Sequence, residues 1–182
     1  MNIVLLAGSN RKNASSTKLL RYMAKELEKK GARAVVIDLW EKPVPLYSPD
    51  GEDRLDRNAA EMIRLVQEAD GIVLGTPEYH GSISGVLKNA LDYMGGQQFS
   101  GKPVLSASSS GGAVGVASLT HLQDIVRNLH GINCPEWISI GGDNRRFDEN
   151  GAPASDTVRT RINRALDYLL FMMERLRIRV NA

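Results

Sequence analysis

The chain has 182 residues, of which 42% are hydrophobic, 23 are basic and 21 are acidic, and it contains one cysteine. This length suits one domain with a full core, and no stretch rich in proline, glycine or serine suggests a linker, so we expect a single domain over residues 1–182. The net charge of +2 is too mild to indicate a nucleic-acid partner, and a single cysteine excludes internal disulfides and cysteine-rich zinc sites.

The start of the chain enters an apolar run at once, and no segment has the pattern of a signal peptide or the length of a membrane span. We therefore expect a cytoplasmic protein without a membrane partner. The cysteine, Cys134, stands next to Pro135, and we expect it to be a small buried packing residue and not a nucleophile.

Short apolar runs alternate with helically spaced apolar residues along the chain. The runs predict strands at residues 3–7, 34–39, 72–74, 104–106 and 138–140. The helical spacing predicts helices over residues 19–27, 59–66, 86–94, 116–129 and 158–176. Parallel neighbours need helical crossovers of one hand, so this alternation predicts an α/β fold, a doubly wound five-stranded parallel sheet with helices on both faces.

The ends of the first helix and the connection that follows the second strand carry further signals. The first helix offers Ser15, Ser16 or Thr17 as its N-cap and Gly31 as its stop. Residues 40–57 form a long connection with three prolines. Loops of that length inside a compact domain are usually functional, so we expect this one to lie over the site or against a partner subunit.

Polar loops rich in glycine and serine follow the first, third and fourth strands, at residues 8–17, 76–85 and 108–115. The carboxyl ends of parallel strands meet at one edge of such a sheet, and ligands bind there. The first loop combines several hydroxyls, Arg11 and a helix start, which together suit a phosphate. The other two loops offer backbone N–H groups to a flat, polar ring.

Several other kinds of site are excluded. The first loop lacks the second and third glycines of a dinucleotide fingerprint, residues 96–103 lack the P-loop hydroxyl, and Ile83 stands where a nucleophile elbow needs serine. The three histidines lack metal-ligand spacing, and the first strand lacks the acidic pair of a receiver domain. We therefore expect no metal and no catalytic acid, base or nucleophile. A cofactor that does its own chemistry remains, and FMN fits one phosphate and one ring.

Three motifs in these loops resemble the NADPH-dependent FMN reductase family, which includes azo, quinone and chromate reductases. The motifs are Gly8-Ser9-x-Arg11, the stretch from Thr76-Pro77-Glu78-Tyr79-His80-Gly81 to Leu87-Lys88-Asn89-Ala90-Leu91-Asp92, and Ser110-Gly111-Gly112. The resemblance implies a flavodoxin-like fold. It also implies an oxidoreductase with bound FMN that takes a hydride from NADPH, or from NADH, and reduces a small acceptor such as free flavin, a quinone or an azo compound.

The resemblance assigns roles to particular residues. Those implied for the phosphate are Ser9, Arg11, Ser16 and Thr17, with the choice between Ser15 and Ser16 left open. Many relatives have asparagine in place of His80. Those implied for the ring are Pro77, Glu78, Tyr79, His80, Gly81, Ser110, Gly111 and Gly112.

Two other functions fit the same residues: a flavodoxin-type electron carrier without NADPH turnover, and a module that has the fold but no flavin. Carriers of that kind are typically strongly acidic, whereas this chain is slightly basic. Relatives usually form dimers or tetramers. The resemblance therefore implies a homodimer or homotetramer, and we expect the helix over residues 87–94 and the proline-rich loop to form the interface.

Overall fold

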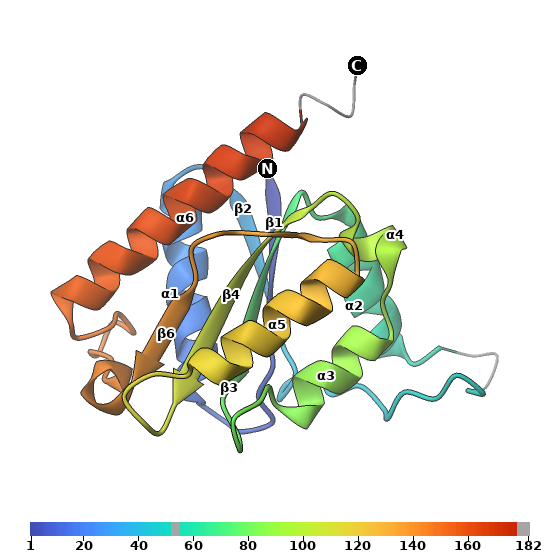
Figure 1. The fold of residues 1–182 in the computed structure, drawn as a ribbon, viewed down its shortest axis with the longest axis horizontal. Coiled ribbons are helices and arrows are strands. Elements are labelled where there is room, and N and C mark those ends of the chain that lie inside the picture. The colour runs from blue at the N-terminus through green and yellow to red at the C-terminus, as the bar shows by residue number, and fades with distance from the viewer. Residues whose placement is uncertain (52–54, 178–182) are drawn as a thin grey trace.

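A computed structural model gives the fold of the chain and describes residues 1–51 and 55–177 (Figure 1). Each predicted strand and helix overlaps an observed one. The strands are β1 (Asn2–Ala7), β2 (Arg33–Asp38), β3 (Gly71–Pro77), β4 (Pro103–Ser110), β5 (Ile132–Asn133) and β6 (Ile138–Gly141). The helices are α1 (Ser15–Lys29), α2 (Arg57–Glu68), α3 (Gly85–Asp92), α4 (Gly96–Phe99), α5 (Val116–Asn128) and α6 (Asp156–Arg177), with a 3-10 turn η1 (Gly142–Arg145).

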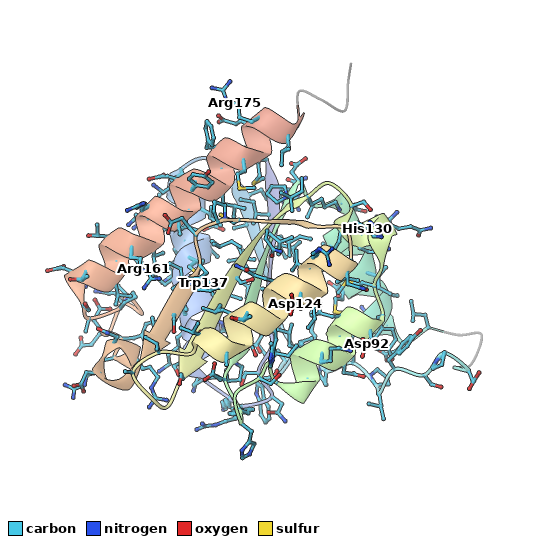
Figure 2. The ribbon with its side chains drawn as sticks, viewed as in Figure 1. Asp92, Asp124, His130, Trp137, Arg161 and Arg175 are labelled. Carbon is cyan, nitrogen blue, oxygen red and sulfur yellow. The ribbon has the colours of Figure 1, made fainter. Side chains whose placement is uncertain are left out.

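The sheet is parallel throughout, with the order β2-β1-β3-β4-β5, and β6 also pairs with β4. β5 pairs with the start of β4 and β6 with its end, so these two short strands share the fifth position. The predicted fifth strand at residues 138–140 corresponds to β6, whereas β5 was not predicted. Pro135, which lies between the two strands, has no N–H to donate to β4. From α6, the Arg161 guanidinium donates to the Trp137 carbonyl oxygen at 3.2 Å; both residues are labelled in Figure 2.

Helices cover both faces of the sheet, and each face has its own buried cluster (Figure 1). Successive side chains of a strand point to opposite faces. In β1, Ile3 and Leu5 accordingly pack with α1 and α6, while Val4 and Leu6 pack with α2, α3 and α5. A strand buried on both faces needs a continuous apolar run, which is the pattern that predicted it. The doubly wound architecture is confirmed.

Two predictions at helix ends had different outcomes. Gly31 has a φ of +83° and follows the last turn of α1, which confirms it as the stop. The predicted serine or threonine N-cap of α1 is wrong, because Ala14 occupies that position and no side chain among the described residues caps it. The N–H groups of the first turn are thus left for another acceptor.

Some features were not predicted, and others lie outside what the structure describes. The four-residue helix α4 is too short to show a helical period, although its Phe99 is fully buried. Residues 52–54 of the long connection lie outside the described residues.

Cys134 is buried in the core beneath α1 and α6, as expected of a packing residue. Within the described ranges, no helix is long and apolar enough to cross a membrane.

Candidate functional site

A cavity of about 250 Å³ opens at the carboxyl edge of the sheet, the lower edge in Figure 1. It is formed by the loops after β1, β3 and β4 and by the end of η1, so the prediction that these three loops meet is confirmed. The residues that line it are Arg11, Asn13, Ala14, Ser15, Ser16, Lys18, Pro77, Glu78, Tyr79, Ser109, Gly111 and Arg145.

The loop after β1 is held tightly against the sheet. The Gly8 N–H donates to the Gly75 carbonyl oxygen at 2.7 Å, and the Ser84 hydroxyl donates to the Gly8 carbonyl oxygen at 2.5 Å. A Cβ at Gly8 would lie only 2.9 Å from the Gly75 oxygen, so this close approach requires glycine. Ser9 is fully buried, and its Oγ accepts from the Arg11 N–H at 3.2 Å. Ser9 therefore shapes the turn that presents Arg11.

The start of α1 has unused hydrogen-bonding groups. The Ser16 and Thr17 hydroxyl oxygens are buried and have no hydrogen-bond partner among the residues that the structure describes. Ser16 lines the cavity, whereas Thr17 does not. Ser15 differs, because its hydroxyl is 3.0 Å from the Ser109 hydroxyl. Buried polar atoms without partners are uncommon in folded proteins and point to a missing ligand or water.

Three cations surround this helix start: Arg11, Lys18 and Arg145 all line the cavity. None of them forms an ion pair with another described residue. Together with the N–H groups of an uncapped helix, they make this end of the cavity suitable for an anion.

The loop after β3 is a tight hairpin. Tyr79 and Ser82 exchange two backbone hydrogen bonds of 3.0 and 3.1 Å, while His80 and Gly81 at the tip have φ values of +50° and +72°. Two successive positive φ values are typical of a type I′ turn. The tip points away from the sheet, since His80 and Gly81 are exposed and line no part of the cavity. Pro77, Glu78 and Tyr79 at its base do line it.

The loop after β4 folds back against β6. Ser110 accepts from the Gly112 N–H at 3.1 Å, and the Gly115 N–H donates to the Ser139 hydroxyl at 2.7 Å. A Cβ at Gly141 would overlap the carbonyl oxygens of Gly112 and Ala113. Gly141 and Ser139 thus set the path of this loop. No local pattern near β6 signals that role, because the contact partners lie 24 to 29 residues earlier in the sequence.

The structure divides the predicted site residues into two groups. The residues on the cavity wall are Arg11, Ser16, Pro77, Glu78, Tyr79 and Gly111. The predicted site residues that do not line the cavity are Ser9, Thr17, His80, Gly81, Ser110 and Gly112. Sequence reasoning missed Lys18 and Arg145. Lys18 could have been found as a cation in the first turn of a helix that follows a phosphate-like loop, whereas only the tertiary structure brings Arg145 to the cavity.

No group of three or more histidine, cysteine, aspartate or glutamate side chains gathers into a metal site within residues 1–51 and 55–177.

Residues 1–145 match the sequence model of the NADPH-dependent FMN reductase family. The chain belongs to this family. The predicted resemblance is thereby confirmed, and as a member of the family the protein is an oxidoreductase that works with FMN and NADPH. This reductase is also 35% identical to an FMN-dependent NADPH-azoreductase of Staphylococcus aureus over 156 residues, which are 84% of this chain and 83% of the relative.

Solved structures support the fold of this reductase. FerB, a flavoenzyme NAD(P)H:acceptor oxidoreductase from Paracoccus denitrificans, superposes with a TM-score of 0.83 at 20% identity and covers 96% of this chain and 97% of its own. The NADH:FMN oxidoreductase EMOB gives 0.74 at 21% identity, with 92% and 87% covered. At these identities the likeness establishes the fold alone, which is the flavodoxin-like α/β fold that we predicted.

Proposed function

We propose that the cavity binds FMN, with the FMN phosphate at the start of α1. The observation that carries this proposal is the buried hydroxyl of Ser16, which lines the cavity and lacks a partner; the neighbouring Thr17 hydroxyl also lacks one but does not line the cavity. A phosphate oxygen accepts hydrogen bonds from hydroxyls and from the free N–H groups of a helix start, and Arg11 and Lys18 supply the opposite charge. Ser16 lines the cavity and has no partner, so we favour it over Ser15 as the phosphate contact.

The residues proposed for the flavin ring are the cavity-lining part of those predicted, namely Pro77, Glu78 and Tyr79 on one loop and Gly111 on the other. When bound, FMN accepts a hydride and passes electrons on, so the protein needs no acid or nucleophile of its own. Its residues bind and orient the reactants. Tyr79 lines the cavity and is 42% exposed, which offers an aromatic surface to a flat acceptor.

For the acceptor we propose a small aromatic or flavin compound. The S. aureus relative is an azoreductase, which supports an azo compound, and quinones and free flavin have the same flat, conjugated form. NADPH as donor follows from the family. We further propose that the protein works in the cytoplasm, where NADPH is produced.

One spectrum tests this function. The purified protein, after addition of FMN and removal of free flavin, is expected to show the visible flavin absorption, and anaerobic NADPH is expected to bleach it. FMN that stays bound and oxidised under NADPH would indicate an electron carrier. A protein that takes up no FMN would contradict the proposed pocket.

We also propose that the protein forms a homodimer or homotetramer through α3 and the proline-rich loop. Asn89 of α3 fastens that loop, because its side chain accepts from the Tyr47 N–H at 2.8 Å and donates to the Pro45 carbonyl oxygen at 2.7 Å. The Tyr93 hydroxyl also donates to the Pro45 carbonyl oxygen, and the Tyr93 ring meets the Tyr47 ring edge to face at 5.2 Å. Residues 45–47 of the loop are thus held against α3 and present Leu46, which is 87% exposed.

A groove lies beside this surface, between α3 and α5, whose Asp92 and Asp124 are labelled in Figure 2. It has a volume of about 460 Å³, and Leu91, Met94 and Ile125 contribute apolar side chains to it. A surface that carries both an apolar projection and an apolar groove can pair with a second copy of itself.

A further inference from the structure

Glu78 makes two contacts that cross the cavity wall. It directly follows Pro77, the last residue of β3. Its backbone N–H donates to the Ser109 carbonyl oxygen of β4 at 2.9 Å. Its carboxylate oxygen Oε2 accepts from the Ser118 N–H at 2.9 Å, in the first turn of α5. One residue of the β3 loop is therefore bonded to both ends of the β4 loop.

The start of α5 depends on this carboxylate. Its N-cap is Gly115, which has no side chain to offer, and its first turn contains no acidic residue. The first N–H groups of a helix need acceptors from elsewhere, and a negative charge stabilises that end of the helix dipole. Glu78 supplies the acceptor and the negative charge, although it lies 40 residues before Ser118 in the sequence. The fit is close, since a Cβ at Gly115 would lie 3.3 Å from Oε2.

We infer that Glu78 is a positioning residue that holds the two ring-facing loops at a set spacing. It does so by bonding the β3 loop to the end of β4 on one side and to the start of α5 on the other. The inference depends on the proposed function only in that the loops so joined are the ones assigned to FMN.

The same contact bears on the orientation of FMN. Two helix starts, those of α1 and α5, follow glycine- and serine-rich loops at this edge of the sheet. The carboxylate of Glu78 occupies the start of α5, while the start of α1 has no acceptor among the described side chains. Glu78 is also the sole acidic residue among the described residues that line the cavity. A phosphate is thus directed to α1 and repelled from α5.

Two variants and a matched control test this inference. Glu78→Ala removes the acceptor, whereas Glu78→Gln keeps a side-chain oxygen that can accept from the Ser118 N–H. Asp56→Ala is the control, because the Asp56 carboxylate also accepts from N–H groups at a helix start, those of Asn58 and Ala59 in α2, but as the N-cap of its own helix, and it lines no part of the cavity. Amide hydrogen exchange is measured on the FMN-free proteins, and FMN affinity by the quenching of FMN fluorescence.

In Glu78→Ala, we expect exchange across residues 109–118 to rise because the Ser118 N–H loses its acceptor. We expect FMN to bind about tenfold more weakly, because binding must then order loops that a hydrogen bond to a charged group no longer holds. Glu78→Gln should restore most of the exchange protection and most of the FMN affinity. Asp56→Ala should lower the melting temperature and leave the exchange across residues 109–118 and the FMN affinity unchanged.

Each other result overturns a defined part of the inference. Unchanged exchange in Glu78→Ala would disprove the link between the loops, whether or not FMN binds. Faster exchange with unchanged FMN affinity would disprove the positioning role. Glu78→Gln behaving like Glu78→Ala would show that charge matters and the contact does not. If the wild-type protein binds no FMN, the proposed function fails, and the exchange experiment still decides whether Glu78 joins the loops.

Discussion

Ser16 and Ser15 are neighbours with opposite hydrogen-bonding states. The Ser16 hydroxyl is buried without a partner, and the Ser15 hydroxyl has one in Ser109. An unsatisfied buried hydroxyl costs the ligand-free protein free energy, and a bound phosphate would recover it. The two serines should therefore respond differently to removal of the hydroxyl.

We expect Ser16→Ala to leave the stability of FMN-free protein unchanged or slightly raised, and to weaken FMN binding by about 1 kcal/mol. Ser15→Ala should lower stability by about 1 kcal/mol instead, because it leaves the Ser109 hydroxyl without its partner. Urea denaturation and FMN titration of both variants provide the measurements. Equal effects of the two substitutions on FMN affinity would count against Ser16 as the phosphate contact.

Arg11 is exposed at the cavity wall and has no ion-pair partner in the described part of the chain. Arg11→Ala is expected to weaken FMN binding by about 1.5 to 3 kcal/mol, the worth of a charge-assisted hydrogen bond, while the fold survives. Arg146→Ala is the control, since Arg146 pairs with Asp143 and does not line the cavity. An FMN titration that gives the same affinity for Arg11→Ala and wild type would exclude this arginine.

The reactivity of Cys134 reports on the packing of the core beneath α1 and α6, where this residue is buried. Burial raises the pKa of its thiol above the usual value, so the side chain stays protonated and unreactive near pH 8. We expect a disulfide reagent such as dithionitrobenzoate to label it only as fast as the protein unfolds. Rapid labelling of the native protein would contradict the burial of this residue.

At the scale of elements, the cavity is set by how the β4 loop meets β6. This loop approaches so closely that Gly141 has no room for a Cβ. Ser139 of β6 also accepts from the Gly115 N–H, so one short strand supports the loop along its length. The position of β6 therefore shapes the site, although none of its residues lines the cavity.

Gly141→Ala is expected to push residues 112–113 away, costing about 1 to 3 kcal/mol of stability as an overpacking change and weakening FMN binding with it. Gly85→Ala serves as the matched control. Gly85 is the first residue of α3, and a Cβ there would meet nothing within 4 Å, so alanine should be neutral or stabilising. Thermal melts with and without FMN measure both effects. A Gly141→Ala protein with wild-type FMN affinity would place the loop outside the binding site.

At the scale of the whole molecule, two exposed apolar surfaces are candidates for contact between copies. One is the α3 surface with Leu46, and the other is on α6, where Tyr168 and Phe171 are 40% and 48% exposed. Their rings are 5.9 Å apart, and the Arg175 guanidinium lies 5.3 Å from the centre of the Phe171 ring. The first surface has an apolar groove beside it, which favours it as the interface.

We expect Leu46→Asp to shift the protein toward the monomer in size-exclusion chromatography with light scattering, because a buried unpaired charge is costly at an interface. Phe171→Asp should retain at least the dimer. A reversed result would assign the principal interface to α6. A wild-type protein that is monomeric at every concentration would contradict the proposed assembly.

Local pattern determined much of this protein. The apolar run of β1, the helical spacing of α1 and the loops of residues 8–17 and 76–85 depend on neighbouring residues, so periodicity and turn chemistry predicted the doubly wound sheet and the edge that carries the site. The family motif lies in those same loops. Turn backbone at the hairpin tip, such as the positive φ of Gly81, also follows from local residue type.

The tertiary structure alone decided which atoms face the cavity. Arg145 reaches it from the end of η1, and Glu78 caps a helix that begins 38 residues later. Ser9, which the motif assigns to the phosphate, also accepts from the Arg11 N–H, and its sequence position alone does not reveal that contact. Ser16 and Ser15 are identical in type and adjacent, and only packing against Ser109 tells them apart. Such roles depend on contacts between distant segments, and these contacts form only when the chain is folded.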